Sequence, residues 1–284
     1  MYPRVASYMK KSIYTVTPDD TLEDARNIML SKGISKLVVV DDDEKPVGLI
    51  TLESMVRALA HKFLSRKISE VKVGDAMTPL PATLTPMRTV KAAASLMLRY
   101  GLPAMPVIDR ESGRLEGLVT RSSLVKAFSD RFSGVYRVSS IMRESFVSVD
   151  RGHSIFYVAK VIDLDASGKA LVFDGKRLVG VISKSDLILM LAKMGGGLRK
   201  VARASRASVY RAPTSLPGVY VAVIAEDVMS PNPITVRPDI DASEAAEIMV
   251  RERVGILPVT WEDKVIGVVT KLEFLEALAS FRKT

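Results

Sequence analysis

The sequence contains no cysteine and no glutamine, and asparagine occurs only at Asn27 and Asn232. Without cysteine the chain can form neither disulfides nor thiolate nucleophiles nor thiolate metal ligands. Few thermolabile side chains beside many Lys, Arg and Glu residues indicate a thermophilic source.

Long hydrophobic segments are also missing. Apolar runs such as residues 187–192 are only a few residues long, whereas a membrane-spanning helix needs about 18 apolar residues. Met1–Arg4 do not show the charged-then-apolar pattern of a secretion signal. We therefore expect a cytoplasmic protein without a membrane partner.

Residues that usually carry chemistry are scarce. The two histidines, His61 and His153, have no second ligand at metal-binding spacing. Aromatic residues make up 6% of the chain, which disfavours a base-stacking platform, so that any RNA contact would be mainly to phosphate. We expect no catalytic residue, no metal site and no required cofactor, and therefore a protein that is not an enzyme.

Positive charge is present in excess and is unevenly distributed. The net charge is +9 at pH 7, and residues 193–225 contain six Lys and Arg residues and no acidic residue. This one segment therefore carries two thirds of the excess, which favours an anionic partner.

One pattern occurs four times along the chain. Each copy opens with a methionine that is followed, 38–40 residues later, by glycine, two apolar residues and a hydroxyl residue. The methionines are Met9, Met77, Met142 and Met229, and the glycines are Gly48, Gly117, Gly180 and Gly267. A spacing held this closely four times indicates an internal repeat.

Each copy has the same predicted secondary structure. In the first copy, strands are expected at residues 13–16, 37–40 and 47–50, with one helix from Leu22 to Gly33 and another from about Leu52. In the fourth copy the corresponding strands are expected at residues 234–236, 257–259 and 265–269. The order strand, helix, strand, strand, helix predicts an α/β unit of about 60 residues, which buries too little apolar surface to be stable alone.

These motifs resemble those of the cystathionine-β-synthase (CBS) family. The resemblance covers residues 4–60, 72–128, 137–192 and 224–280. It implies that repeats pair into two Bateman modules, one at residues 1–130 and one at residues 131–284, with a basic insertion at 193–223. It also implies regulation by an adenine nucleotide such as AMP, ADP or ATP.

The Gly-x-x-(Thr/Ser)-x-x-Asp step is the ligand signature of that family, in which the carboxylate binds a ribose diol. The third repeat matches it in full with Ser183 and Asp186, and Lys169 is a candidate for phosphate. The fourth repeat has Thr270 and Glu273. Weaker candidates in the first module are Thr51, Thr120, Thr17 and Thr85.

A purely structural interpretation of these residues is also open. Ser-x-x-Asp and Thr-x-x-Ser are typical of a helix N-terminus, where the side chains cap backbone amides. Asp186, Thr51 and Thr120 would then only cap the helices that follow them.

Two functions remain as hypotheses. In the first, the protein docks on RNA, most plausibly on the ribosome in a silencing or hibernation role, through cations of the insertion: Lys193, Arg199, Lys200, Arg203, Arg206 and Arg211. In the second, it is an adenine-nucleotide sensor that docks on an enzyme or transporter. The insertion could also be a solvated linker, and the oligomeric state is open between monomer and homodimer.

Overall fold

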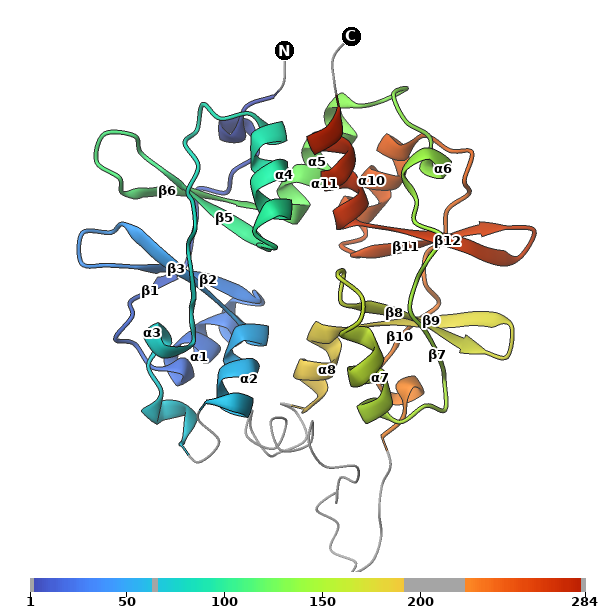
Figure 1. Ribbon diagram of the computed structural model, residues 1–284, viewed down its shortest axis with the longest axis horizontal. Coiled ribbons are helices and arrows are strands. Elements are labelled where there is room, and N and C mark those ends of the chain that lie inside the picture. Colours follow the sequence, from blue (N-terminus) through green and yellow to red (C-terminus); the bar gives the residue numbers. More distant parts are fainter. Residues whose placement is uncertain (1–2, 63–65, 192–222, 282–284) are drawn as a thin grey trace, which may run out of the picture.

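The computed structural model describes residues 3–62, 66–191 and 223–281. Four α/β repeats surround a common centre, with repeats one and two on one side and three and four on the other (Figure 1). The predicted fold class is confirmed.

Repeat one shows how the sequence sets the elements. Its strands and helices are β1 (Thr15–Val16), α1 (Leu22–Lys32), β2 (Lys36–Val40), β3 (Pro46–Thr51) and α2 (Leu52–His61). Thr21 begins α1 by accepting a hydrogen bond from the backbone N–H of Asp24, whose carboxylate accepts one from Thr21 in return. Gly33 ends α1 in the left-handed conformation, with φ of 62°.

The other repeats follow the same order. Repeat two contains α3 (Val73–Ala76), β4 (Thr78–Pro79), α4 (Val90–Arg99), β5 (Ala104–Ile108), β6 (Leu115–Thr120) and α5 (Arg121–Arg131). Repeat three contains α6 (Val138–Ile141), β7 (Ser148–Asp150), α7 (Ile155–Ile162), β8 (Lys169–Asp174), β9 (Arg177–Ser183) and α8 (Lys184–Leu191). Repeat four contains β10 (Ser230–Pro231), α10 (Ala242–Arg251), β11 (Ile256–Trp261), β12 (Lys264–Thr270) and α11 (Lys271–Ser280).

The first predicted strand is shorter than expected in repeats one and four. Of residues 13–16 only Thr15 and Val16 form a strand, and residues 234–236 are reduced to a single bridge between Val236 and Val259. The reason is that these segments pair with only one neighbouring strand, at the edge of a small sheet.

Repeats pair by exchanging their opening segments. β4 of repeat two pairs with β3 of repeat one, and β10 of repeat four pairs with β9 of repeat three. In return, Lys10 bridges to Leu118, and Arg143 bridges to Val268. The exchange joins repeats one and two into module one, and repeats three and four into module two, as predicted.

The two motifs that revealed the repeat meet across each pair. The opening methionine of one repeat packs on the glycine of its partner, so that Met77 covers Gly48 and Met9 covers Gly117. A Cβ placed on Gly48 would lie 2.5 Å from Sδ of Met77. The fixed spacing of methionine and glycine therefore reflects a close contact that a side chain would block.

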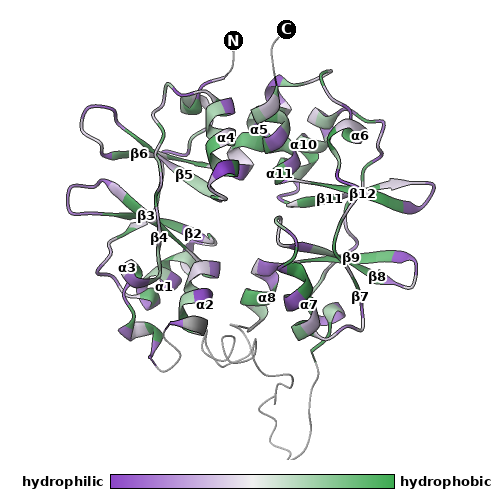
Figure 2. Cartoon of the chain, in the orientation of Figure 1, coloured by the Kyte–Doolittle hydropathy of each residue, from purple (hydrophilic) through white to green (hydrophobic). Residues whose placement is uncertain are grey.

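The two modules meet mainly through repeats two and four. Helices α4 and α5 pack against α10 and α11, and their apolar faces share one core (Figure 2). Phe128 of α5 and Phe274 of α11 are fully buried, with ring centroids 5.1 Å apart.

The contact between repeats one and three is smaller. There α2 packs against α8, and Ile188 of α8 joins the core of repeat one. Lys184 also forms an ion pair with Glu53 at 3.6 Å. In the described part of the chain, no helix is both long and apolar enough to cross a membrane.

Candidate functional site

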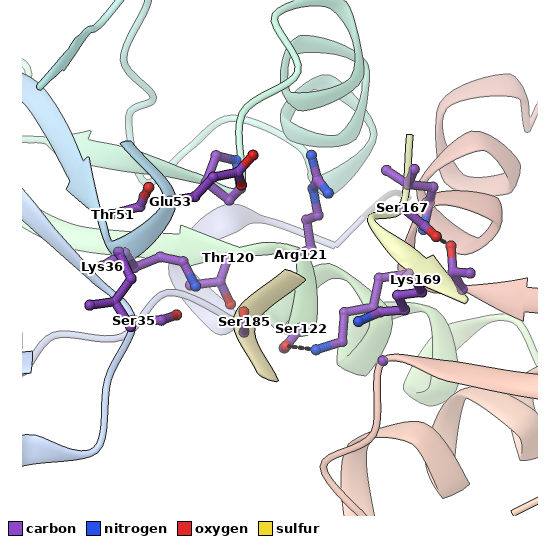
Figure 3. Close-up of a pocket in the computed structure, with 16 residues that line it drawn as sticks. Ser35, Lys36, Thr51, Glu53, Thr120, Arg121, Ser122, Ser167, Lys169 and Ser185 are labelled. Atoms are coloured by element: carbon purple, nitrogen blue, oxygen red, sulfur yellow. Dashed lines mark hydrogen bonds between the residues drawn. The ribbon is translucent and has the colours of Figure 1, made fainter. Parts of the chain in front are cut away.

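A polar cavity of about 280 Å³, the central cavity, lies where the four repeats meet. Each repeat supplies one cation to its lining: Lys36, Arg121, Lys169 and Lys271. Figure 3 shows Lys36 and Arg121 of module one and Lys169 of module two around this cavity. Among the described residues, the only acidic one in the lining is Glu53, whose side chain is 57% exposed. The cavity is thus built for an anion.

The strand register explains why these cations converge. Lys36 is the first residue of β2 and pairs with Thr51, and Lys169 is the first residue of β8 and pairs with Ser183. In repeats two and four the cation instead follows the hydroxyl residue, as the first residue of α5 or α11. Modules one and two therefore contribute cations at matching positions.

The electrostatic environment is strongly positive. Burial, together with the charges of Lys169, Lys36 and Arg121, lowers the pKa of Lys271 to about 8. Burial also lowers the pKa of Lys36, with Lys10 and Arg121 adding to the effect. These shifts show that the cations repel one another in a partly dehydrated space, and an anion there would relieve the repulsion.

Lys169, the predicted phosphate ligand, lies in this cavity. Burial lowers its pKa, which the nearby Asp186 raises and Arg121 lowers. Its ammonium reaches repeat four, since a Cβ placed on Gly255 would lie 2.9 Å from Nζ of Lys169. The side chain therefore spans the two repeats of module two.

Ser183 and Asp186 form a helix cap, and neither of them is in the lining of the cavity. One oxygen of Asp186, Oδ2, accepts hydrogen bonds from the backbone N–H of Ser183 at 2.8 Å and from its hydroxyl at 2.7 Å. Ser185, between them, lines the cavity. Asp186 therefore acts as a cap, and these two hydrogen bonds involve only one of its two oxygens.

Thr270 and Glu273 are arranged differently. Oε2 of Glu273 accepts from both the N–H and the hydroxyl of Thr270, at 2.6 Å each, and Oε1 accepts from Arg143 at 3.2 Å. Arg143 also donates to Asp165 at 2.7 Å. Both oxygens of this buried carboxylate already have donors from the protein, whereas Thr270 itself lines the cavity.

The weaker candidates divide into two groups. Thr51 and Thr120 line the cavity and cap α2 and α5, where Ser54 and Ser123 replace the carboxylate. Thr17 and Thr85 are in turns outside its lining. The six cations of the insertion, with the RNA hypothesis that rests on them, lie outside the described residues.

Sequence reasoning missed three of the four cavity cations: Lys36, Arg121 and Lys271. The sequence did contain an indication of them, because each is a neighbour of the hydroxyl residue of the repeated Gly-x-x-(Thr/Ser) motif. Lys36 pairs with Thr51 across two strands, and Arg121 and Lys271 directly follow the hydroxyl residue in the sequence. Within the ranges that the structure describes, no group of three or more potential ligands could hold a metal ion.

The comparisons with known proteins give a family and a fold. The sequence model of the family described as CBS domain matches residues 5–61, 73–130, 138–193 and 225–280. Protein MJ1225 of Methanocaldococcus jannaschii is 23% identical over 201 residues, which is 66% of this chain and 70% of that protein. Its crystal structure, presented as that of a proposed archaeal homologue of g-AMPK, has a TM-score of 0.77 at 22% identity and covers 98% of this chain and 100% of that one.

Two further relatives match about half of the chain. A CBS domain-containing protein of Dictyostelium discoideum is 34% identical over 128 residues, covering 43% of this chain and 88% of that protein. Inosine-5'-monophosphate dehydrogenase of Korarchaeum cryptofilum is 35% identical over 130 residues, covering 46% of this chain and only 25% of the enzyme.

Proposed function

The chain belongs to the CBS domain family, and we propose that it is a non-catalytic regulator that binds an adenine nucleotide in module two. In this proposal AMP, ADP or ATP lies between repeats three and four, and its phosphates enter the central cavity. The observation that carries the proposal is the meeting of four cations, one from each repeat, in a cavity with a single exposed acidic residue.

The phosphate end is assigned from charge. Lys169 and Lys271 line the cavity from module two, and Lys36 and Arg121 face them from module one. Hydrogen bonds between phosphate and such cations are charge-assisted and are worth about 1.5–3 kcal/mol each. Because both modules supply cations to the cavity, a bound phosphate would hold the two modules together.

The ribose end is assigned to Asp186. Two repeats have a carboxylate at the last position of the Gly-x-x-(Thr/Ser)-x-x-Asp motif, Asp186 and Glu273. Within the described residues Asp186 is in no ion pair, whereas Glu273 is bonded to Arg143. Ser54 and Ser123 offer no charge in module one. A partner protein, either an enzyme or a transporter, would then recognise the nucleotide-bound form of the protein.

The test is calorimetric titration with AMP, ADP and ATP, together with thermal melts. Ligand at 100 times its dissociation constant should stabilise the fold by about 2.7 kcal/mol. The informative variant is Asp186→Ser, because serine already caps α2 and α5 at this position and should keep α8 capped. We expect it to weaken binding by about 10–100-fold.

Asp42→Ala is the matched control, since Asp42 is an exposed residue of the β2–β3 turn. It removes the same charge and should leave affinity unchanged. Equal affinity of Asp186→Ser and the wild-type protein, or the absence of binding by all three nucleotides, would refute the proposed function.

A further inference from the structure

A second cavity, of about 440 Å³, lies between the two modules beside α5 and α10. Its cations are Lys10 from repeat one and Arg253 and Lys271 from repeat four, and in the part of the chain that the structure describes no acidic residue lines it. Its apolar lining comes from Val125, Met249 and Val250. Neither Lys10 nor Arg253 lines the central cavity.

Lys10 lacks the partners that its counterpart in module two has. Arg143 follows the opening methionine as Lys10 does, and each pairs with a residue of the partner repeat's second hairpin strand. Arg143 is neutralised by Asp165 and Glu273. In module one Ser123 stands where Glu273 stands in module two, and within the described residues Lys10 has no ion pair.

Arg253 has an unusual backbone conformation. It lies three residues before β11, and the residues at the same place before β2 and β5 are Gly33 and Gly101. All three are left-handed, with φ of 62° for Gly33, 66° for Gly101 and 56° for Arg253. Glycine adopts this conformation without strain and arginine does not. An arginine that adopts this conformation and lines a cationic cavity is a candidate functional residue.

Lys271 connects the two cavities. It lines both of them, and its ammonium donates a hydrogen bond to the hydroxyl of Ser122 at 2.8 Å across the module boundary. A ligand in the second cavity would therefore touch residues of both modules: Lys10 and Val125 of module one, and Arg253 and Lys271 of module two.

From these observations we propose that the second cavity is a binding site for a small organic phosphate. The phosphate group binds Lys10, Arg253 and Lys271, and an apolar body packs against Val125, Met249 and Val250. The site shares Lys271 with the one proposed for adenine nucleotide but differs from it in using neither Ser183 nor Asp186.

Phenyl phosphate and inorganic phosphate are suitable probes, titrated calorimetrically into the full chain. Arg253→Gly restores the residue that repeats one and two have at this place, so it should fold at least as well as the wild-type protein. We expect this variant and Lys10→Ser to bind one equivalent of phenyl phosphate fewer, or to bind it about tenfold more weakly at one site. Lys176→Ser, which removes an exposed cation from the β8–β9 turn, should bind as the wild-type protein does.

Two comparisons separate this proposal from the nucleotide site. Asp186→Ser should leave phenyl phosphate binding intact, and phenyl phosphate should bind more tightly than inorganic phosphate because of the apolar lining. Wild-type stoichiometry and affinity in both Arg253→Gly and Lys10→Ser would overturn the proposal. Equal affinity for the two probes would also overturn it, since no apolar body would then be recognised.

Discussion

The pKa of Lys271 couples phosphate binding to protons. Burial and three neighbouring cations lower it to about 8 from an ordinary value of 10.5. A phosphate in the central cavity favours the charged ammonium and raises this pKa towards its ordinary value. Binding should therefore take up a proton, to the extent of about 0.1 per site at pH 7, 0.5 at pH 8 and 0.9 at pH 9.

The same linkage sets the pH dependence of affinity. The fraction of Lys271 that is already protonated falls about tenfold between pH 7 and pH 9, so ADP should bind up to about tenfold more weakly at pH 9. The stability of the ligand-free protein should change in the opposite direction. The pKa of Lys271 is lower in the folded protein than in the unfolded chain. Between pH 8 and 10.5 the unfolded chain therefore binds more protons at this residue, and the free energy of unfolding rises with pH in that window.

Calorimetry in buffers of different ionisation enthalpy measures the proton uptake directly. The control is Lys271→Arg, because arginine already occupies the matching position of module one as Arg121 and stays charged at pH 9. This variant should bind ADP with little change in affinity from pH 7 to pH 9. The reasoning is refuted if the wild-type protein takes up no proton at pH 8, or if Lys271→Arg keeps the full pH dependence.

Two further predictions concern the scaffold and the insertion. Gly267→Ala should lower the melting temperature more than Gly48→Ala. A Cβ at Gly267 would lie 2.8 Å from the backbone oxygen of Arg143, whereas the nearest neighbour of a Cβ at Gly48 is the flexible end of Met77. Similar melting temperatures of the two variants would contradict this prediction. If the insertion binds single-stranded RNA, replacing four of its cations with serine should flatten the plot of log affinity against log salt by about 3, and unchanged ribosome or RNA association would assign the segment to a linker. The four residues are Arg199, Lys200, Arg203 and Arg206.

The sequence was sufficient for the repeat, and the family resemblance was sufficient for the pairing of the repeats. A nearly constant distance from methionine to glycine in the four copies is visible without a structure, and its cause is the contact of Met77 with Gly48 and of Met9 with Gly117. The faces through which the modules meet were not predictable in the same way. The apolar side of a helix indicates that it is buried, but not that Phe128 of α5 lies against Phe274 of α11.

The repeated motif was sufficient to name the hydroxyl residues Thr51, Thr120 and Thr270 that line the cavity, but not to show that cations of four repeats converge there. Lys36 and Lys271 are more than 200 residues apart in the sequence and converge because the modules join. The ion pair of Glu273 with Arg143 likewise depends on the exchange of opening segments between repeats three and four.

The most direct test of the central claim is a crystal structure of the protein with ADP. We predict that the ribose hydroxyls bind Asp186 and that the phosphates lie in the central cavity, within hydrogen-bond distance of Lys169 or Lys271. A nucleotide bound only in module one, or one whose phosphates point to solvent away from the four cations, would contradict the account.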